Sequence, residues 1–152
     1  MLVQVVLLCA RPTLVIPHAG RFDTVGENVL VAWDDSREAA RAVADALPWL
    51  CKARQVQVLQ CETPMDDNLT ERRRFRLDAL RQWLTWHGVD AKVQLELSEI
   101  GVGEVLLSRA ADAGADLIVM GAYGHARWTE RVLGGATRIV LQSMTMPVLM
   151  SH

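Results

Sequence analysis

The sequence has few cysteines, no long apolar run and no excess of positive charge. Its three cysteines, Cys9, Cys51 and Cys61, are too scattered for a disulfide framework, and no C-x-x-C pair suggests a zinc or redox site. No stretch approaches the roughly 18–20 apolar residues that span a bilayer. The net charge of −2 argues against a protein that coats nucleic acid or anionic lipid, because such binding depends on positive charge. We therefore expect a cytoplasmic protein without nucleic-acid or membrane partners.

Catalytic and metal-binding signatures are also missing from the sequence. There is no G-x-x-x-x-G-K-[ST] run and no G-x-S-x-G elbow, and the four histidines form no cluster with metal-ligand spacing. Nothing supplies an obvious general base beside a phosphate. The sequence therefore predicts no catalytic residues.

Alternating β-rich and helix-like segments organise the chain from residue 29 onward. The 152 residues fit one domain, and 51 % apolar with 22 % charged residues is ordinary for a folded protein. The predicted strands are Val29–Trp33, Val56–Cys61, Ala91–Leu97, Asp116–Met120 and Met146–Met150. The predicted helices are Arg37–Leu47, Leu69–His87, Gly103–Ala113 and Glu130–Gln142, the last with an alternative start near Gly135. Strands separated by helices predict an α/β fold, a five-stranded parallel sheet with helices on both faces.

The loops after three of these strands are the places to look for a binding site. A parallel sheet binds ligands beyond the carboxyl ends of its strands, here after Trp33, Cys61 and Met120. Gly121 and Gly124 permit either the close approach of backbone N–H groups to a ligand or tight turns and helix packing. Asp34 either faces a ligand or takes part in capping the next helix. The pattern leaves both pairs of alternatives open.

An arginine run and two tryptophans mark the second predicted helix. The arginines are followed by Asp78 and preceded by Glu71, with no aromatic platform, so we predict a solvated helix face rather than a nucleic-acid site. Trp83 and Trp86 are predicted to anchor a core or an interface. The arginines are Arg72, Arg73, Arg74 and Arg76.

Several motifs together resemble the universal stress protein family. Gly121, Gly124 and Gly134 match the family's spacing of Gly, two residues, Gly, nine residues, Gly, and Thr137 follows three residues later. The runs 31–36, 115–121 and 146–149 extend the resemblance over residues 28–152. It implies a Rossmann-like, adenine nucleotide α-hydrolase-like fold and a stress-response module that binds ATP or a related adenine nucleotide weakly, with at most slow ATP hydrolysis. The alternative is a dimerisation or interaction scaffold of the same fold that binds no nucleotide.

The resemblance also implies which residues bind the nucleotide. Asp34 would face the ribose or a Mg²⁺ ion, the backbone around Cys61 would edge the adenine, and the glycine-rich segment would hold the phosphates. The implied set is Ala32, Trp33, Asp34, Cys61, Gly121, Gly124, His125, Arg127, Gly134, Gly135, Ala136 and Thr137. Gly135 departs from the family's binding members, which carry Ser or Thr there. The lost hydroxyl should weaken binding by roughly ten- to a hundredfold.

Residues 1–17 lie outside the matching region, with residues 18–27 predicted to be a linker. The segments Val5-Val6 and Pro12–Val15 echo Val140-Leu141 and Pro147–Met150 at an offset of 135 residues. Some relatives carry two domains in tandem, so the chain resembles a second half preceded by the last helical turn and last strand of a first; an unrelated apolar extension is the alternative. We predict that Thr13–Ile16 pairs antiparallel with the last strand. We also expect a homodimer through that strand and this arm, paired within one chain or exchanged between two.

Overall fold

Six strands form one sheet in the order β1-β6-β5-β2-β3-β4. The computed structural model describes residues 5–6, 8–122 and 135–152. The strands are β1 (Thr13–Val15), β2 (Asn28–Trp33), β3 (Gln55–Glu62), β4 (Ala91–Leu97), β5 (Leu117–Gly121) and β6 (Val148–Ser151). The helices are α2 (Arg37–Leu50), α3 (Asp67–Trp86), α4 (Val102–Asp112) and α5 (Gly135–Ser143). All five predicted parallel strands are present, so the predicted α/β class is confirmed.

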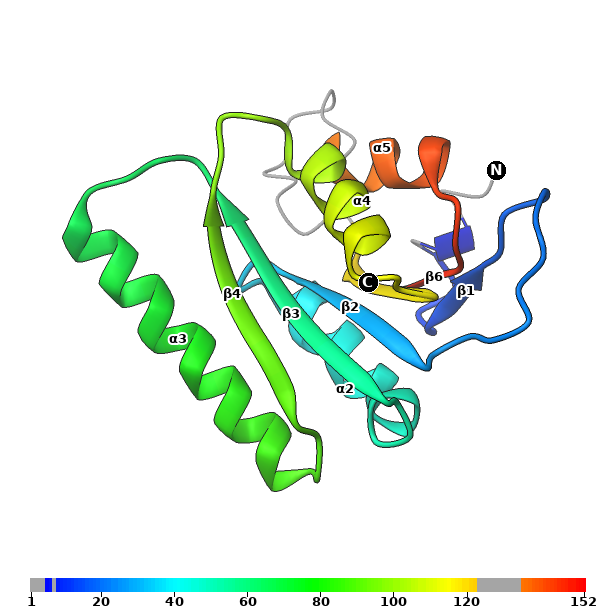
Figure 1. Ribbon diagram of the computed structural model, residues 1–152, viewed down its shortest axis with the longest axis horizontal. Coiled ribbons are helices and arrows are strands. Elements are labelled where there is room, and N and C mark those ends of the chain that lie inside the picture. The colour runs from blue at the N-terminus through cyan, green and yellow to red at the C-terminus, as the bar shows by residue number, and fades with distance from the viewer. Residues whose placement is uncertain (1–4, 7, 123–134) are drawn as a thin grey trace.

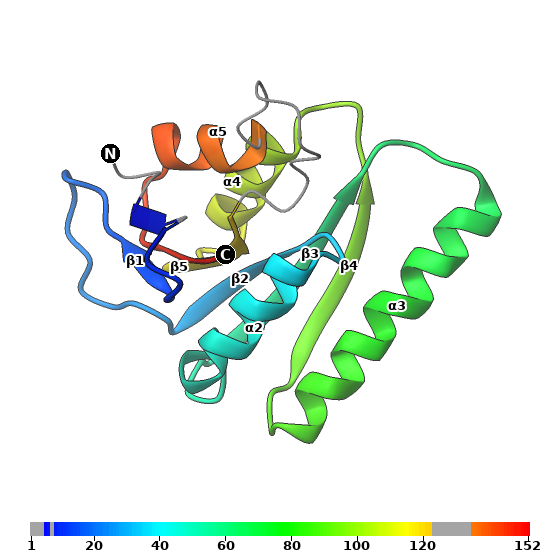
Figure 2. The same cartoon turned by 180° about the vertical axis from the view of Figure 1, so that it is seen from behind.

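The helices cover both faces of the sheet (Figure 1), and the reverse view shows α2 and α3 side by side on one of them (Figure 2). That face buries one core, in which Val31, Leu50 and Leu84 lie among the buried residues. The face under α4 and α5 buries a second core that includes Leu30 and Ile118. The central strands are apolar on both faces for this reason, which is what their continuous apolar runs predicted.

Capping residues account for where the helices begin. The side chain of Ser36 accepts a hydrogen bond from the backbone N–H of Ala39 at 3.0 Å and starts α2. Asp66 accepts one from Leu69 N–H at 2.8 Å, so α3 begins two residues before the predicted start at Leu69. Helix α2 also runs through Pro48 to Leu50, beyond the predicted end at Leu47. Pro48 lies in the last turn, where its missing N–H removes one hydrogen bond without interrupting a longer ladder.

The two predicted elements at the carboxyl side differ from the structure at their ends. The last helix starts at Gly135, which agrees with the alternative start, while residues 130–134 of the longer prediction lie outside the described residues. Strand β6 starts at Val148, two residues later than predicted. Pro147 precedes it and cannot donate to a ladder, which places the proline just outside the strand.

Asp116, predicted as the first residue of a strand, instead ties two strands together just before β5. Its carboxylate accepts hydrogen bonds from the backbone N–H groups of Gly26, Glu27 and Asn28, at 3.0, 3.2 and 2.9 Å. Burial alone would raise the pKa of this carboxyl, but a hydrogen bond from Thr24 and the three backbone donors outweigh it and lower the pKa. The charged carboxylate therefore holds the entry of β2 beside β5.

The amino-terminal segment adds the antiparallel strand predicted for it. In β1, Thr13 faces Met150, Leu14 faces Leu149 and Val15 faces Val148. Strand β1 thus covers the outer edge of β6, an edge that would otherwise present unpaired N–H and C=O groups. Within the described part of the chain, no helix is both long and apolar enough to cross a membrane.

Candidate functional site

A cavity of about 430 Å³ lies at the carboxyl end of the parallel sheet. The ends of β2, β3 and β5 form one side, and the first turns of α4 and α5 form the other. Its volume falls within the range of small-molecule sites, about 300–1,000 Å³. The lining residues are Ala32, Trp33, Asp34, Leu59, Cys61, Glu62, Arg73, Gly101, Val102, Gly103, Leu106, Met120, Gly121, Gly135, Ala136, Thr137 and Ile139.

The structure brings most of the predicted site residues together in this cavity. Those that line it are Ala32, Trp33, Asp34, Cys61, Gly121, Gly135, Ala136 and Thr137. The others, Gly124, His125, Arg127 and Gly134, lie outside the described residues. Residues more than 100 positions apart in sequence thus share one concave surface. This surface lies at the carboxyl ends of the strands, where a parallel sheet is expected to bind ligands.

Gly121 is required for helix packing. A Cβ atom at this position would lie 2.6 Å from the backbone nitrogen of Ala39 and 2.6 Å from the backbone carbon of Glu38. The end of β5 therefore touches the first turn of α2 directly. Of the two roles open to this glycine from sequence, close helix–sheet packing is the one supported by contacts.

Asp34 is held by the residue that caps α2. One of its carboxylate oxygens accepts hydrogen bonds from both the backbone N–H, at 3.1 Å, and the hydroxyl of Ser36. Ser36, rather than Asp34, caps the helix, because its hydroxyl oxygen accepts a hydrogen bond from the backbone N–H of Ala39. Asp34 is therefore fixed in orientation at the rim of the cavity while it supports the cap indirectly.

The segment Gly101–Gly103, where the predicted helix Gly103–Ala113 begins, brings α4 against α5. A Cβ atom on Gly103 would lie 2.8 Å from the Cβ atom of Ile139 and 3.2 Å from the carbonyl oxygen of Ala136. The first turns of both helices consequently meet beside the cavity. The sequence carried a signal in the two closely spaced glycines, but their partner on α5 could not be identified without the fold.

The first turn of α5 is suited to an anion. Gly135, Ala136 and Thr137 line the cavity at the amino end of this helix, where backbone N–H groups and the helix dipole favour negative charge. Among the described residues beyond its own helix backbone and chain neighbours, no atom lies within 4 Å of the position of a Cβ on Gly135. Across the cavity, the indole N–H of Trp33 is buried without a hydrogen-bond partner among the described residues, a donor available to a ligand.

Cys61 contributes a small apolar surface to the cavity. Burial is the main cause that raises the pKa of its thiol to about 11, with further contributions from the carboxylates of Glu96 and Glu62 against the opposing charge of Arg109. The thiol is therefore protonated at neutral pH and is a poor nucleophile.

Two of the clustered arginines tie α3 to the loop after β2. Arg73 lies 3.6 Å from a carboxylate oxygen of Asp35 and 3.4 Å from one of Glu62, and Arg76 also pairs with Asp35. Asp35 has a backbone φ of +63°, a left-handed conformation that Asp tolerates better than most residues. The prediction of a fully solvated arginine face is therefore wrong for Arg73, whose guanidinium is half-buried and lines the cavity.

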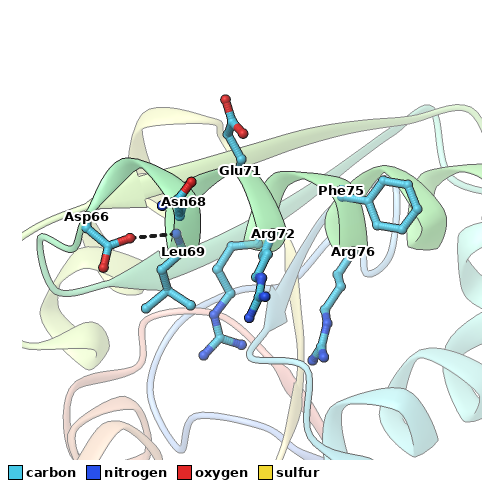
Figure 3. Close-up of a pocket in the computed structure, with 8 residues that line it drawn as sticks. Asp66, Asn68, Leu69, Glu71, Arg72, Phe75 and Arg76 are labelled. Carbon is cyan, nitrogen blue, oxygen red and sulfur yellow. Dashed lines mark hydrogen bonds between the residues drawn. The ribbon is translucent and has the colours of Figure 1, made fainter.

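The same arginines form a separate, open hollow on α3 with a volume of about 1250 Å³. Figure 3 shows Arg72 and Arg76 pointing to one side of the helix while Glu71 points away from it. Arg73 lines both this hollow and the cavity at the sheet. Trp83 packs partly buried against the core, one of the two roles predicted for it, whereas Trp86 is exposed.

Among the described residues, no group of three or more His, Cys, Asp or Glu side chains could hold a metal ion. The carboxylates among the residues that line the cavity are those of Asp34 and Glu62. A magnesium ion would therefore have to be held mainly by the phosphates of a ligand, as this hard cation usually is.

Comparison with known proteins identifies the chain's relatives. It is 25 % identical over 139 residues to a universal stress protein of Methanocaldococcus jannaschii, an alignment that covers 90 % of this chain and 84 % of the relative. A universal stress protein structure from Archaeoglobus fulgidus superposes with a TM-score of 0.70 at 20 % identity, covering 92 % of this chain and 50 % of that one. Another from the same organism, solved in complex with dAMP, gives a TM-score of 0.67 at 17 % identity, with 84 % and 98 % covered.

Other structural neighbours described as universal stress proteins contain cAMP or AMP. The sequence profile of the universal stress protein family matches residues 26–152, which is most of the chain and includes every parallel strand. The fold and the sequence profile agree. The chain belongs to the universal stress protein family.

Proposed function

We propose that the chain binds an adenine nucleotide in the cavity at the end of the sheet and does not turn it over rapidly. One observation carries this proposal. The amino terminus of α5 and the ends of β2, β3 and β5 line the same cavity, whose volume of about 430 Å³ suits a nucleotide. Family relatives solved with dAMP, cAMP and AMP support it. The bound nucleotide would report cellular energy or stress state, with ATP as one candidate.

Each part of the cavity has a role in this proposal. The N–H groups at Gly135–Thr137 bind the phosphate, and Asp34 accepts from the ribose hydroxyls or orients a magnesium ion held by the phosphates. The strand end at Cys61 provides a flat edge for the adenine. His125 and Arg127, outside the described residues, are proposed to add positive charge, and Gly124 and Gly134 to complete the phosphate loop.

Replacing Gly135 with serine is expected to tighten nucleotide binding by roughly ten- to a hundredfold. A hydroxyl that donates to a charged phosphate contributes about 1.5–3 kcal/mol, and a Cβ at Gly135 meets no described residue outside its own helix within 4 Å. Calorimetric titration with AMP and with ATP measures the change. Gly135→Ala is the matched control, because it adds the Cβ without the hydroxyl. Equal affinities for the serine and alanine variants would show that this position does not contact phosphate.

Asp34→Ala is expected to weaken nucleotide binding while lowering the free energy of unfolding by no more than about 1 kcal/mol, the usual contribution of a cap. The cap itself belongs to Ser36, which remains in the variant. Ser36→Ala provides the comparison, since it removes the cap and keeps the carboxylate. Denaturant unfolding and nucleotide titration on both variants separate the two roles. A stability loss in Asp34→Ala equal to that of Ser36→Ala, with unchanged affinity, would assign Asp34 to the helix alone.

A scaffold that binds no nucleotide is the second candidate function. The observation in its favour is Gly135, which replaces the hydroxyl residue of the family's binding members. This candidate predicts that neither Gly135→Ser nor Asp34→Ala changes any binding signal.

A further inference from the structure

A groove of about 520 Å³ lies between α2 and α3, on the face of the sheet opposite α4 and α5. Helix α2 packs over β2, β5 and β6, whereas α3 packs over β4, so the two helices lie over strands on either side of β3 (Figure 2). The volume falls within the range of small-molecule sites, about 300–1,000 Å³. The apolar residues that line the groove are Trp33, Ala40, Val43, Ala79, Leu80 and Trp83.

Small side chains keep this groove open at its mouth, and larger ones fix its wall. Ala40 of α2 and Ala79 of α3 both line the groove and are exposed. Val43 and Leu80 line it from the buried side. The ring centroids of Trp83 and His87 lie 4.1 Å apart, a contact that holds the Trp83 indole in place. The groove is therefore a preformed apolar site between two helices of defined position.

Trp33 supplies the groove with a hydrogen-bond donor. Its ring packs against the core under α2 and α3, the core to which the Trp83 ring also packs. Its indole N–H is buried and has no hydrogen-bond partner in the part of the chain that the structure describes. Buried polar groups in native proteins nearly always have a partner, and an unsatisfied one is costly. An acceptor on a molecule in the groove would satisfy this donor.

The charged side chains beside the groove balance one another. The carboxylate of Asp35 pairs with both Arg73 and Arg76, and Arg73 also pairs with Glu62. Two carboxylates and two guanidinium groups thus leave no surplus charge in this cluster. Because a charged group that is buried without a partner is costly, the groove favours an uncharged ligand.

We propose that the groove between α2 and α3 is a second ligand site, which binds an uncharged, planar aromatic molecule with a hydrogen-bond acceptor. The indole rings of Trp33 and Trp83 provide apolar surface for the ligand ring, and aromatic pairs gain energy beyond the area that they bury. Ala40 and Ala79 leave room for it, and the Trp33 N–H donates to its acceptor. The site does not depend on nucleotide binding, although Trp33 lines both cavities.

Titration of the full-length, ¹⁵N-labelled chain with quinoline tests this proposal. Quinoline is planar, is uncharged at slightly alkaline pH, and carries one ring nitrogen as acceptor. The indole N–H resonances of Trp33 and Trp83 should shift in a saturable way, and Trp33→Phe and Trp83→Phe identify them by their loss. Trp86, which is exposed and is not among the lining residues, should keep its resonance unchanged. Shifts that grow without saturation, or that affect Trp86 equally, would overturn the proposal.

Two matched variants locate the bound quinoline. Ala79→Phe places a ring in the groove and should abolish the saturable shifts, whereas Val102→Phe places the same ring in the cavity at the end of the sheet and should retain them. Both positions are exposed, so both chains are expected to fold. Ala40→Phe blocks the groove from the α2 side if Ala79→Phe does not fold. Loss of binding in Val102→Phe together with full binding in the groove variant would overturn the assignment.

The chemistry of the ligand is tested with two analogues of quinoline. Naphthalene has the same shape without the acceptor, and Trp33→Phe keeps an aromatic ring without the donor. The ratio of quinoline affinity to naphthalene affinity should therefore fall roughly two- to tenfold in Trp33→Phe, the usual effect of one hydrogen bond. An unchanged ratio would overturn the assignment of the Trp33 N–H as the donor. Quinoline-4-carboxylate should bind the parent chain more weakly than quinoline, and tighter binding would overturn the assignment of an uncharged ligand.

Discussion

Gly121→Ala is expected to lower the free energy of unfolding by about 3 kcal/mol, at the upper end of the cost of overpacking. The added methyl would lie 2.6 Å from backbone atoms of both Glu38 and Ala39, and backbone moves less easily than the end of a side chain. The end of β5 and the first turn of α2 must then separate. Urea unfolding of the nucleotide-free protein measures the effect.

Gly135→Ala is the control for this substitution, since its Cβ meets no atom within 4 Å in the part of the chain that the structure describes outside its own helix. That variant should be as stable as the parent or slightly more stable, because alanine restricts the unfolded chain more than glycine does. If Gly121→Ala instead retained full stability and lost nucleotide binding, Gly121 would serve phosphate approach and the packing account would be wrong.

Asp116→Ala is expected to lower the free energy of unfolding by about 3 kcal/mol. Three part-buried backbone N–H groups lose their acceptor at once. A fully buried donor left unsatisfied costs about 1–3 kcal/mol, and access of water lowers the cost for each of these three. Asp112→Ala should change stability by less than about 1 kcal/mol, because that exposed carboxylate only pairs with Arg109 on the same helix. Equal stability losses in the two variants would contradict the role of Asp116 in holding the entry of β2 beside β5.

The pH dependence of the Asp116 effect follows from the lowered pKa of its carboxyl. A carboxyl with a pKa depressed by folding contributes its full stabilisation above the unfolded pKa, about 3.9. The contribution is lost as the pH falls through the lower pKa of the folded state. The stability difference between the parent and Asp116→Ala should therefore be constant from neutral pH to about pH 5 and shrink in strong acid. A difference that does not depend on pH would assign the effect to packing.

The sheet was predictable from sequence because each strand has a local signature. Strand β4 was predicted with the bounds that it has in the structure, Ala91–Leu97. Strands β2 and β5 were predicted from continuous apolar runs, which are typical of strands covered by helices on both faces. The helix starts were less well placed. Asp66 is identified as a capping residue only from the backbone geometry, because its carboxylate accepts a hydrogen bond from the N–H of Leu69.

The candidate site was predictable only for residues that belong to motifs of adjacent positions in the sequence. Trp33, Asp34 and Gly135 follow from motifs along the chain, and the structure places them in one cavity. Gly103 and Arg73 reach that cavity through contacts with α5 and with the loop after β2, and such contacts depend on how distant elements pack. The role of Gly121 was ambiguous for the same reason, since ligand approach and helix approach require the same missing side chain.

Binding of an adenine nucleotide to the parent protein tests the central claim most directly. The measurement is a thermal-shift and calorimetric titration of nucleotide-free protein with AMP, ADP, ATP and cAMP, with and without magnesium. A ligand at 100 times its Kd stabilises the folded state by about 2.7 kcal/mol, so at least one of these nucleotides should raise the melting temperature in a saturable way with one site per chain. No change in melting temperature and no heat of binding with any of them, at millimolar concentration, would contradict the proposal and leave the scaffold function in its place.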